Sequence, residues 1–298
     1  MRVRTDDGWN LALEPFEAAG DPRAAVLLGP AMMANRRSLD RPSGRGLAST
    51  LAEGGLAVYT LDPRGHGDSL PRASRAVDWS YDDVVRLDLP AALRTVRARH
   101  PGLPVALVGH SLCGHGGAAA LGLSDEKLAD ALVMIASNVW VPRLEPSRTR
   151  WLAKRAILEL WCAVTRRVGF FPTRALRAGS DDEARSYVLQ FDRWARSDRW
   201  TDESGAVDYL AAVARLEVPT LSVLSRGDRL LCRPEAGRRF CSHFAARPPE
   251  VWEVDGAELG LPRGPGHMEL VTDARCRPLW ERLAHWIVEA TDRALSPS

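Results

Sequence analysis

Short apolar runs alternate with helical patterns along most of this chain, and this alternation limits the folds that it can adopt. Each run has the length and composition of a buried strand, and the helical stretches allow successive strands to lie parallel through right-handed crossovers. Strands that are apolar on both faces fit a sheet with helices on both sides. The sequence therefore predicts an α/β fold with a doubly wound, mostly parallel sheet. The expected core strands are 24–28, 57–61, 105–108, 131–136, 220–224 and 251–254.

The expected helices lie between these strands, with a hairpin at the start of the chain. Asp7 and Gly8 separate two short β-rich segments, which is a turn signal for an antiparallel pair. The helical patterns cover residues 44–53, 81–99, 112–123, 233–243 and about 273–295.

One long segment interrupts the alternation. Residues 138–217 contain no convincing strand, only helical stretches that are rich in arginine and tryptophan. An insertion of this size between two strands of a sheet predicts a helical cap. We therefore expect a core made of residues 1–137 and 218–298, with the cap at 138–217.

The composition argues against several classes of function. The 298 residues suffice for one large α/β domain with an insertion or for two small domains. A net charge of +2 gives no reason to expect nucleic acid or an anionic membrane as a partner. Neither an apolar leader nor a membrane-spanning run of about eighteen apolar residues is visible. The five scattered cysteines suit reduced thiols in a cytoplasmic protein and do not support a zinc site.

The segment around Ser111 has the pattern of a nucleophile elbow. An apolar run leads straight into Gly109-His110-Ser111, and a helix rich in glycine and alanine follows without a spacer. On such a turn the serine hydroxyl is exposed, and the next backbone N–H, that of Leu112, can stabilise an oxyanion. Cys113 occupies the position of the usual second glycine, so we expect it to crowd the turn as a packing residue. The alternative is that Cys113 is a second nucleophile.

A serine nucleophile needs a general base and an acid that orients the base. Asp228 follows an apolar strand and a glycine turn, and His267 lies in a glycine- and proline-rich loop before the last helix. Their order after Ser111 is the one expected when each catalytic residue follows a strand. Asp255 is the alternative acid, and the other histidines are weaker candidates for the base. The alternative for Asp228 is a capping role in its turn.

The second oxyanion donor is expected in the loop after the first core strand. Pro30 has no N–H, so the donor is Ala31 or Met32, and we favour Met32.

Three motifs together give the chain a resemblance to the α/β-hydrolase superfamily. Residues 62–69 read DPRGHGDS, which matches the Asp-x-Arg-Gly-x-Gly-x-Ser signature of many members. Residues 109–112 resemble the Gly-His-Ser-Leu/Met-Gly-Gly elbow, and Gly266-His267 resembles the terminal Gly-His of the superfamily. The loop at Pro30 lacks the usual His-Gly pair and looks like a bacterial subgroup of hydrolases. The resemblance implies an eight-stranded sheet of the α/β-hydrolase fold with an inserted cap.

These observations predict a serine hydrolase that cleaves a carboxylic ester or thioester through an acyl-enzyme on Ser111, without cofactor or metal. The same residues would also serve an acyltransferase or a C–C bond hydrolase, and the fold also serves non-hydrolytic ligand-binding proteins. The cap tryptophans suit a small-molecule substrate with an apolar or aromatic acyl or alcohol part, although most of them are expected in the cap's own core. Oligomeric state is left open. Four cap arginines are candidates for a carboxylate clamp or for a solvated helix face: Arg143, Arg148, Arg150 and Arg155.

Overall fold

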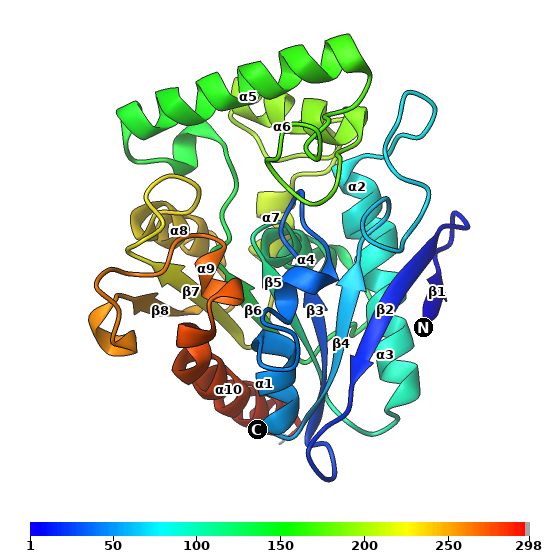
Figure 1. Ribbon diagram of the computed structural model, residues 1–298, viewed down its shortest axis with the longest axis vertical. Helices are drawn as coiled ribbons and strands as arrows, with labels where there is room; N and C mark the ends of the chain where they lie inside the picture. Colours follow the sequence, from blue (N-terminus) through cyan, green and yellow to red (C-terminus); the bar gives the residue numbers. More distant parts are fainter. Residues whose placement is uncertain (296–298) are drawn as a thin grey trace.

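A single eight-stranded sheet organises the protein, whose computed structural model describes residues 1–295 (Figure 1). The strand order is β1-β2-β4-β3-β5-β6-β7-β8; β2 is antiparallel to both of its neighbours, and the remaining pairs are parallel. The predicted doubly wound, mostly parallel sheet is therefore confirmed. The strands are β1 (Arg2–Arg4), β2 (Asn10–Phe16), β3 (Ala24–Gly29), β4 (Leu56–Asp62), β5 (Val105–His110), β6 (Ala131–Ile135), β7 (Thr220–Ser225) and β8 (Glu250–Val254).

Helices cover both faces of the sheet and bury a separate apolar core on each. Alternate residues of a strand point to opposite faces, so Leu27 of β3 belongs to one core and Val26 and Leu28 to the other. The helices α3 (Leu89–Arg99), α4 (Leu112–Leu123) and α8 (Pro234–Cys241) contribute to the first core, whereas α1 (Leu47–Glu53) and α10 (Arg277–Leu295) pack on the second. No helix within residues 1–295 has the length and apolar character needed to cross a bilayer.

The helical pattern at 81–99 forms three consecutive pieces. A first turn, α2 (Tyr81–Asp83), begins with a capping box between Ser80 and Asp83, and a π-helical turn at Val84–Asp88 connects it to α3. Pro90 stands in the first turn of α3. A proline has no N–H to donate to the carbonyl four residues earlier, so it interrupts the α-helical hydrogen bonds where the wider turn occurs.

The segment between β6 and β7 is helical and lies above the carboxyl ends of the strands. Figure 1 shows α5 (Arg148–Val168) and α6 (Arg185–Ser197) across the top of the molecule. The short α7 (Tyr209–Val213) packs against α4. The remaining helix, α9 (Glu269–Thr272), follows the loop that carries His267.

Cys113, in the first turn of α4, packs against β3, where Gly29 leaves room for its side chain. An ideal Cβ on Gly29 would lie 2.4 Å from the Cys113 Cβ and 2.7 Å from its sulfur. The side chain is fully buried, as the packing interpretation of Cys113 requires. The usual elbow has a glycine at the position of Cys113, which lets helix and sheet approach closely. Here the glycine is Gly29 on β3, and it makes room for the cysteine on α4.

This contact predicts a specific double-mutant result. Gly29→Ala should destabilise the protein by about 1–3 kcal/mol, because the new methyl group meets Cys113. Cys113→Gly should restore part of that loss when combined with it, although glycine inside a helix costs up to about 1 kcal/mol by itself. Urea unfolding of the wild type, both single variants and the double variant measures this coupling. Strictly additive losses would contradict the proposed contact.

Candidate active site

Ser111 stands on a strained turn at the start of α4. Its backbone has φ 49° and ψ −105°, a conformation that non-glycine residues rarely adopt. The turn is compressed on both sides: a Cβ on Gly109 would lie 2.2 Å from the Cys113 backbone, and one on Gly114 would lie 1.9 Å from the Ser137 hydroxyl. The Ser137 hydroxyl donates to the Ser111 carbonyl at 3.0 Å. These contacts hold the strained serine at the edge of a cavity.

Asp228 and His267 are joined directly. The Asp228 Oδ2 accepts a hydrogen bond from Nδ1 of His267 at 2.5 Å, and it also accepts the backbone N–H of Cys232 at 2.9 Å. Asp228 Oδ1 accepts the N–H of Leu231 at 2.9 Å, so the carboxylate both caps its own turn and holds the imidazole. Burial alone would raise the pKa of Asp228, but His267 and the backbone N–H groups hold it below its ordinary value.

The loops of these two residues are packed against each other. A Cβ on Gly227 would lie 1.9 Å from the carbonyl oxygen of Gly264, which leaves room for glycine only. The Ser225 hydroxyl donates to the carbonyl of Pro265 at 2.5 Å. The loop after β7 therefore fixes the loop that carries His267.

Asp255, the alternative acid, lies in a different turn, where its carboxylate accepts hydrogen bonds from the backbone N–H groups of Ala257 and Glu258.

His110 has a role that the sequence did not indicate: its Nε2 donates to the His267 carbonyl at 3.0 Å. Burial, followed by the neighbouring His267, lowers the pKa of His110 to about 3, so its ring stays neutral. His110 thus supports the position of His267.

The expected oxyanion donors lie on the same cavity. Leu112 begins α4, where first-turn N–H groups have no partner within the helix. Met32 lines the cavity as well, and its N–H makes no hydrogen bond with any described residue. The N–H of the next residue, Met33, is occupied: it donates to the Glu183 carboxylate at 2.6 Å.

A buried ion pair adjoins this loop. His66 Nε2 lies 3.1 Å from Glu183 Oε1, while its Nδ1 lies 2.9 Å from the carbonyl of Arg64. Both ring nitrogens thus face acceptors, which requires a protonated imidazole. Burial alone would lower the pKa of His66, but the charge and hydrogen bond of Glu183, with a contribution from Asp181, raise it to about 9.

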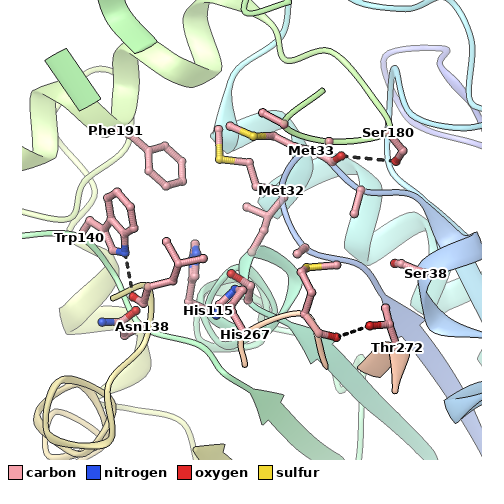
Figure 2. Close-up of a pocket in the computed structure, with 18 of the residues that line it drawn as sticks. Met32, Met33, Ser38, His115, Asn138, Trp140, Ser180, Phe191, His267 and Thr272 are labelled. Carbon is pink, nitrogen blue, oxygen red and sulfur yellow. Dashed lines mark hydrogen bonds between the residues drawn. The ribbon is translucent and has the colours of Figure 1, made fainter. Parts of the chain in front are cut away.

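The cavity between the strand ends and the helical segment has a volume of about 460 Å³. Ser111 and His267 both line it, although the Ser111 hydroxyl makes no hydrogen bond with any described residue. Figure 2 shows Trp140 and Phe191 on one side of the pocket, with Ser38 and Thr272 on the opposite side. The walls are thus mainly apolar and aromatic on one side and more polar on the other.

A buried lysine, Lys154, contacts one ring of the aromatic wall, that of Trp140. Trp140 stacks on Trp161 with ring centroids 6.1 Å apart, and its Nε1 donates to the Leu231 carbonyl at 3.0 Å. Lys154 lies 5.2 Å from the Trp140 ring centroid and forms a buried ion pair with Glu145 at 2.8 Å. Burial removes water from the ammonium group, and a desolvated cation contributes more to such a ring contact than an exposed one.

The other tryptophans and arginines of this segment have mainly structural partners. Trp194 and Trp200 are fully buried, and Trp151 is partly buried against the same core. Three of the four candidate clamp arginines form ion pairs within the protein: Arg143 with Asp198, Arg150 with Glu145, and Arg155 with Glu159 and Asp192.

Comparison with known families identifies the superfamily. A family model described as serine aminopeptidase S33, within the α/β-hydrolase superfamily, matches residues 20–257. The chain belongs to this family. The resemblance seen in the sequence motifs is confirmed at this level.

The α/β-hydrolase fold recurs in solved structures of low sequence identity. DcsB, solved in complex with its substrate analogue, is 16% identical with a TM-score of 0.66, covering 97% of this chain and 98% of that protein. The esterase EaEST from Exiguobacterium antarcticum is 15% identical with a TM-score of 0.62, covering 97% and 99%. A monoacylglycerol lipase from Paleococcus ferrophilus is 16% identical with a TM-score of 0.59, covering 94% and 99%. These likenesses show the fold; no match is found among curated proteins.

The His66–Glu183 pair predicts a pH-dependent stability. The folded pKa of about 9 lies above the ordinary value of 6.5, so the pair's contribution is full below pH 6.5 and is lost as pH rises through about 9. Urea unfolding at pH values on both sides of this window should show a larger alkaline loss for the wild type than for the double variant His66→Gln/Glu183→Gln, which leaves no unpaired carboxylate at this buried position. The difference between the two proteins cancels groups that titrate in both. Equal losses would contradict a charged His66.

Proposed function

We propose that this α/β-hydrolase cleaves carboxylic esters or thioesters by way of an acyl-enzyme on Ser111. The observation that carries the proposal is the Asp228–His267 hydrogen bond of 2.5 Å at a cavity that Ser111 also lines. A serine hydroxyl is a weak nucleophile at neutral pH, and an adjacent imidazole with a fixed tautomer corrects this. Asp228 fixes that tautomer by accepting from Nδ1, which leaves Nε2 of His267 free to act as the base.

In this mechanism Ser111 attacks the substrate carbonyl while His267 takes the hydroxyl proton and passes it to the leaving group. Asp228 stabilises the imidazolium that forms. The N–H groups of Leu112 and Met32 stabilise the oxyanion, at about 3 kcal/mol each by analogy with protease oxyanion holes. Water then hydrolyses the acyl-enzyme, with His267 again as the base.

We also propose that the segment 138–217 acts as a cap that shapes the acyl or leaving-group pocket. Support comes from Trp140, Trp161 and Phe191, which give the cavity an aromatic wall. Such a wall favours a small-molecule substrate with an apolar or aromatic acyl or alcohol part. The five buried, unpaired cysteines fit a reducing compartment, and we propose a cytoplasmic location.

A chain-length series of p-nitrophenyl esters and acyl-CoA thioesters tests the reaction. Ser111→Ala should abolish turnover, and Asp228→Asn should lower kcat about 10⁴-fold because the imidazole loses its correct tautomer. Cys113→Gly is the matched control at the elbow. Burial raises the pKa of the Cys113 thiol, so the thiol stays protonated, and the variant that lacks it should retain activity. A fluorophosphonate probe should label Ser111 in the wild type and in Cys113→Gly.

The outcomes separate the alternatives. Turnover that survives Ser111→Ala would overturn the mechanism. A Cys113→Ala protein that is inactive beside an active Ser111→Ala protein would assign the nucleophile to Cys113. Folded wild type without a fluorophosphonate adduct would favour a ligand-binding protein, and ester consumption only in the presence of an added alcohol would favour acyl transfer.

A further inference from the structure

We propose that Glu183 is a positioning residue that holds the oxyanion-hole loop in its working conformation from the inserted helical segment. This inference rests on the proposed function, because it concerns the donor assigned to Met32. Glu183 does not line the cavity; it acts through Met33, the residue that follows the donor.

The segment that includes Glu183 holds Met33 at both ends of its backbone. The N–H of Met33 donates to Glu183 Oε1 at 2.6 Å, and its carbonyl accepts the N–H of Ser180 at 2.8 Å. The Ser180 hydroxyl also donates to this carbonyl at 3.4 Å, and Figure 2 shows this bond. The carbonyl also accepts the N–H of Asp181 at 3.3 Å. A Cβ on Gly179 would lie 2.5 Å from this carbonyl oxygen, so the two backbones touch.

This hold is needed because Met33 is in the left-handed region, at φ 62°. A side chain with a Cβ rarely adopts this conformation unless the surroundings impose it. The peptide that links Met32 and Met33 is therefore oriented by contacts from another element. Because the N–H of Met33 donates to Glu183, the N–H groups of Ala31 and Met32 are those in this stretch without a partner among the described residues, and we assign the donor to Met32.

Glu183 is itself fixed in place. Its backbone pairs with Phe171 through two hydrogen bonds, of 2.9 and 3.1 Å, and its side chain is fully buried. The oxygen that accepts from Met33 also accepts from His66 of the 62–69 loop. One carboxylate oxygen thus joins the oxyanion-hole loop, the loop after β4 and the inserted segment.

The decisive variants separate the hydrogen-bond acceptor from the charge. Glu183→Gln keeps an oxygen that can accept from Met33, whereas Glu183→Leu fills similar space without one. The double variant His66→Leu/Glu183→Leu removes both members of the ion pair, which avoids an unpaired buried charge and protects folding. Asp192→Asn is the matched control, since Asp192 pairs with arginines of the same segment and does not contact Met33.

The readouts are kcat and KM for a p-nitrophenyl ester and the rate ratio between an ester and its thionoester. Sulfur is a poor hydrogen-bond acceptor, so an intact oxyanion hole favours the ester. In Glu183→Leu and in the double variant we expect kcat to fall about 100-fold, the loss typical of one oxyanion donor, with KM within about twofold. The ester preference should fall in parallel. Glu183→Gln should retain most of both quantities, and Asp192→Asn should keep the wild-type ratio.

An ester preference that stays at the wild-type value in the folded Leu variants would overturn the positioning role, as would a loss in Glu183→Gln equal to that in Glu183→Leu. A change in KM alone would assign Glu183 to substrate binding instead and would equally overturn the proposal. Failure of the proposed function gives a different result: turnover in wild type would then be unaffected by Ser111→Ala, whatever the Glu183 variants do.

Discussion

The close approach of α4 to the sheet at Ser111 is the constraint on which the rest of the site depends. Gly109 and Gly114 leave no space for a methyl group between the helix, the β5 backbone and Ser137. The chain must therefore leave β5 and enter α4 within one residue, and that residue takes the strained conformation. Strain of this kind persists where packing on both sides over-determines it. The position of the hydroxyl is thus a consequence of backbone contacts more than of side-chain interactions.

Buried ion pairs fix the loop after β4, and one of them joins this loop to the inserted segment. Asp62 pairs with Arg36, Arg64 with Asp88, and His66 with Glu183, and each pair has at least one fully buried side chain. Removing one member of such a pair leaves an uncompensated charge, so the three pairs restrict the loop strongly. The signature residues 62–69 therefore read as scaffolding for the site. Their charges face other segments of the chain, and none of them lines the cavity.

The fold and part of the candidate site could be predicted because their signals are local. Apolar runs and glycine turns mark strand ends, and the strand ends place Ser111, Asp228 and His267 on one edge of a parallel sheet. Glu183 gave no such signal: it lies 150 residues from Met33 and 117 from His66, in a segment without strand or motif. His110 was visible in the elbow, but its bond to the carbonyl of His267 depends on tertiary packing. The π turn near Pro90 is a third case. The apolar periodicity of residues 81–99 predicts one continuous helix, whereas the proline within it is the local signal for the interruption that the structure contains.

The inserted segment makes two kinds of contact at the candidate site, and these differ in how freely their residues can vary. Trp140, Trp161 and Phe191 form a wall of the cavity, and changes there alter its shape without changing the hydrogen bonds that hold Met33 in the loop after β3. Residues 180–183 contact the core through hydrogen bonds to Met33 and Gly67, and the geometry of those bonds leaves little freedom. Under the proposed function, the aromatic wall is therefore where substrate preference would change while the contacts at Met33 are retained. The two sets of residues are interleaved along the chain, since Trp161 lies in α5 before residues 180–183 and Phe191 lies in α6 after them, and Ser180 lines the cavity as well. What distinguishes the two sets is the kind of contact: ring packing at the wall, and hydrogen bonds to backbone groups at Met33 and Gly67.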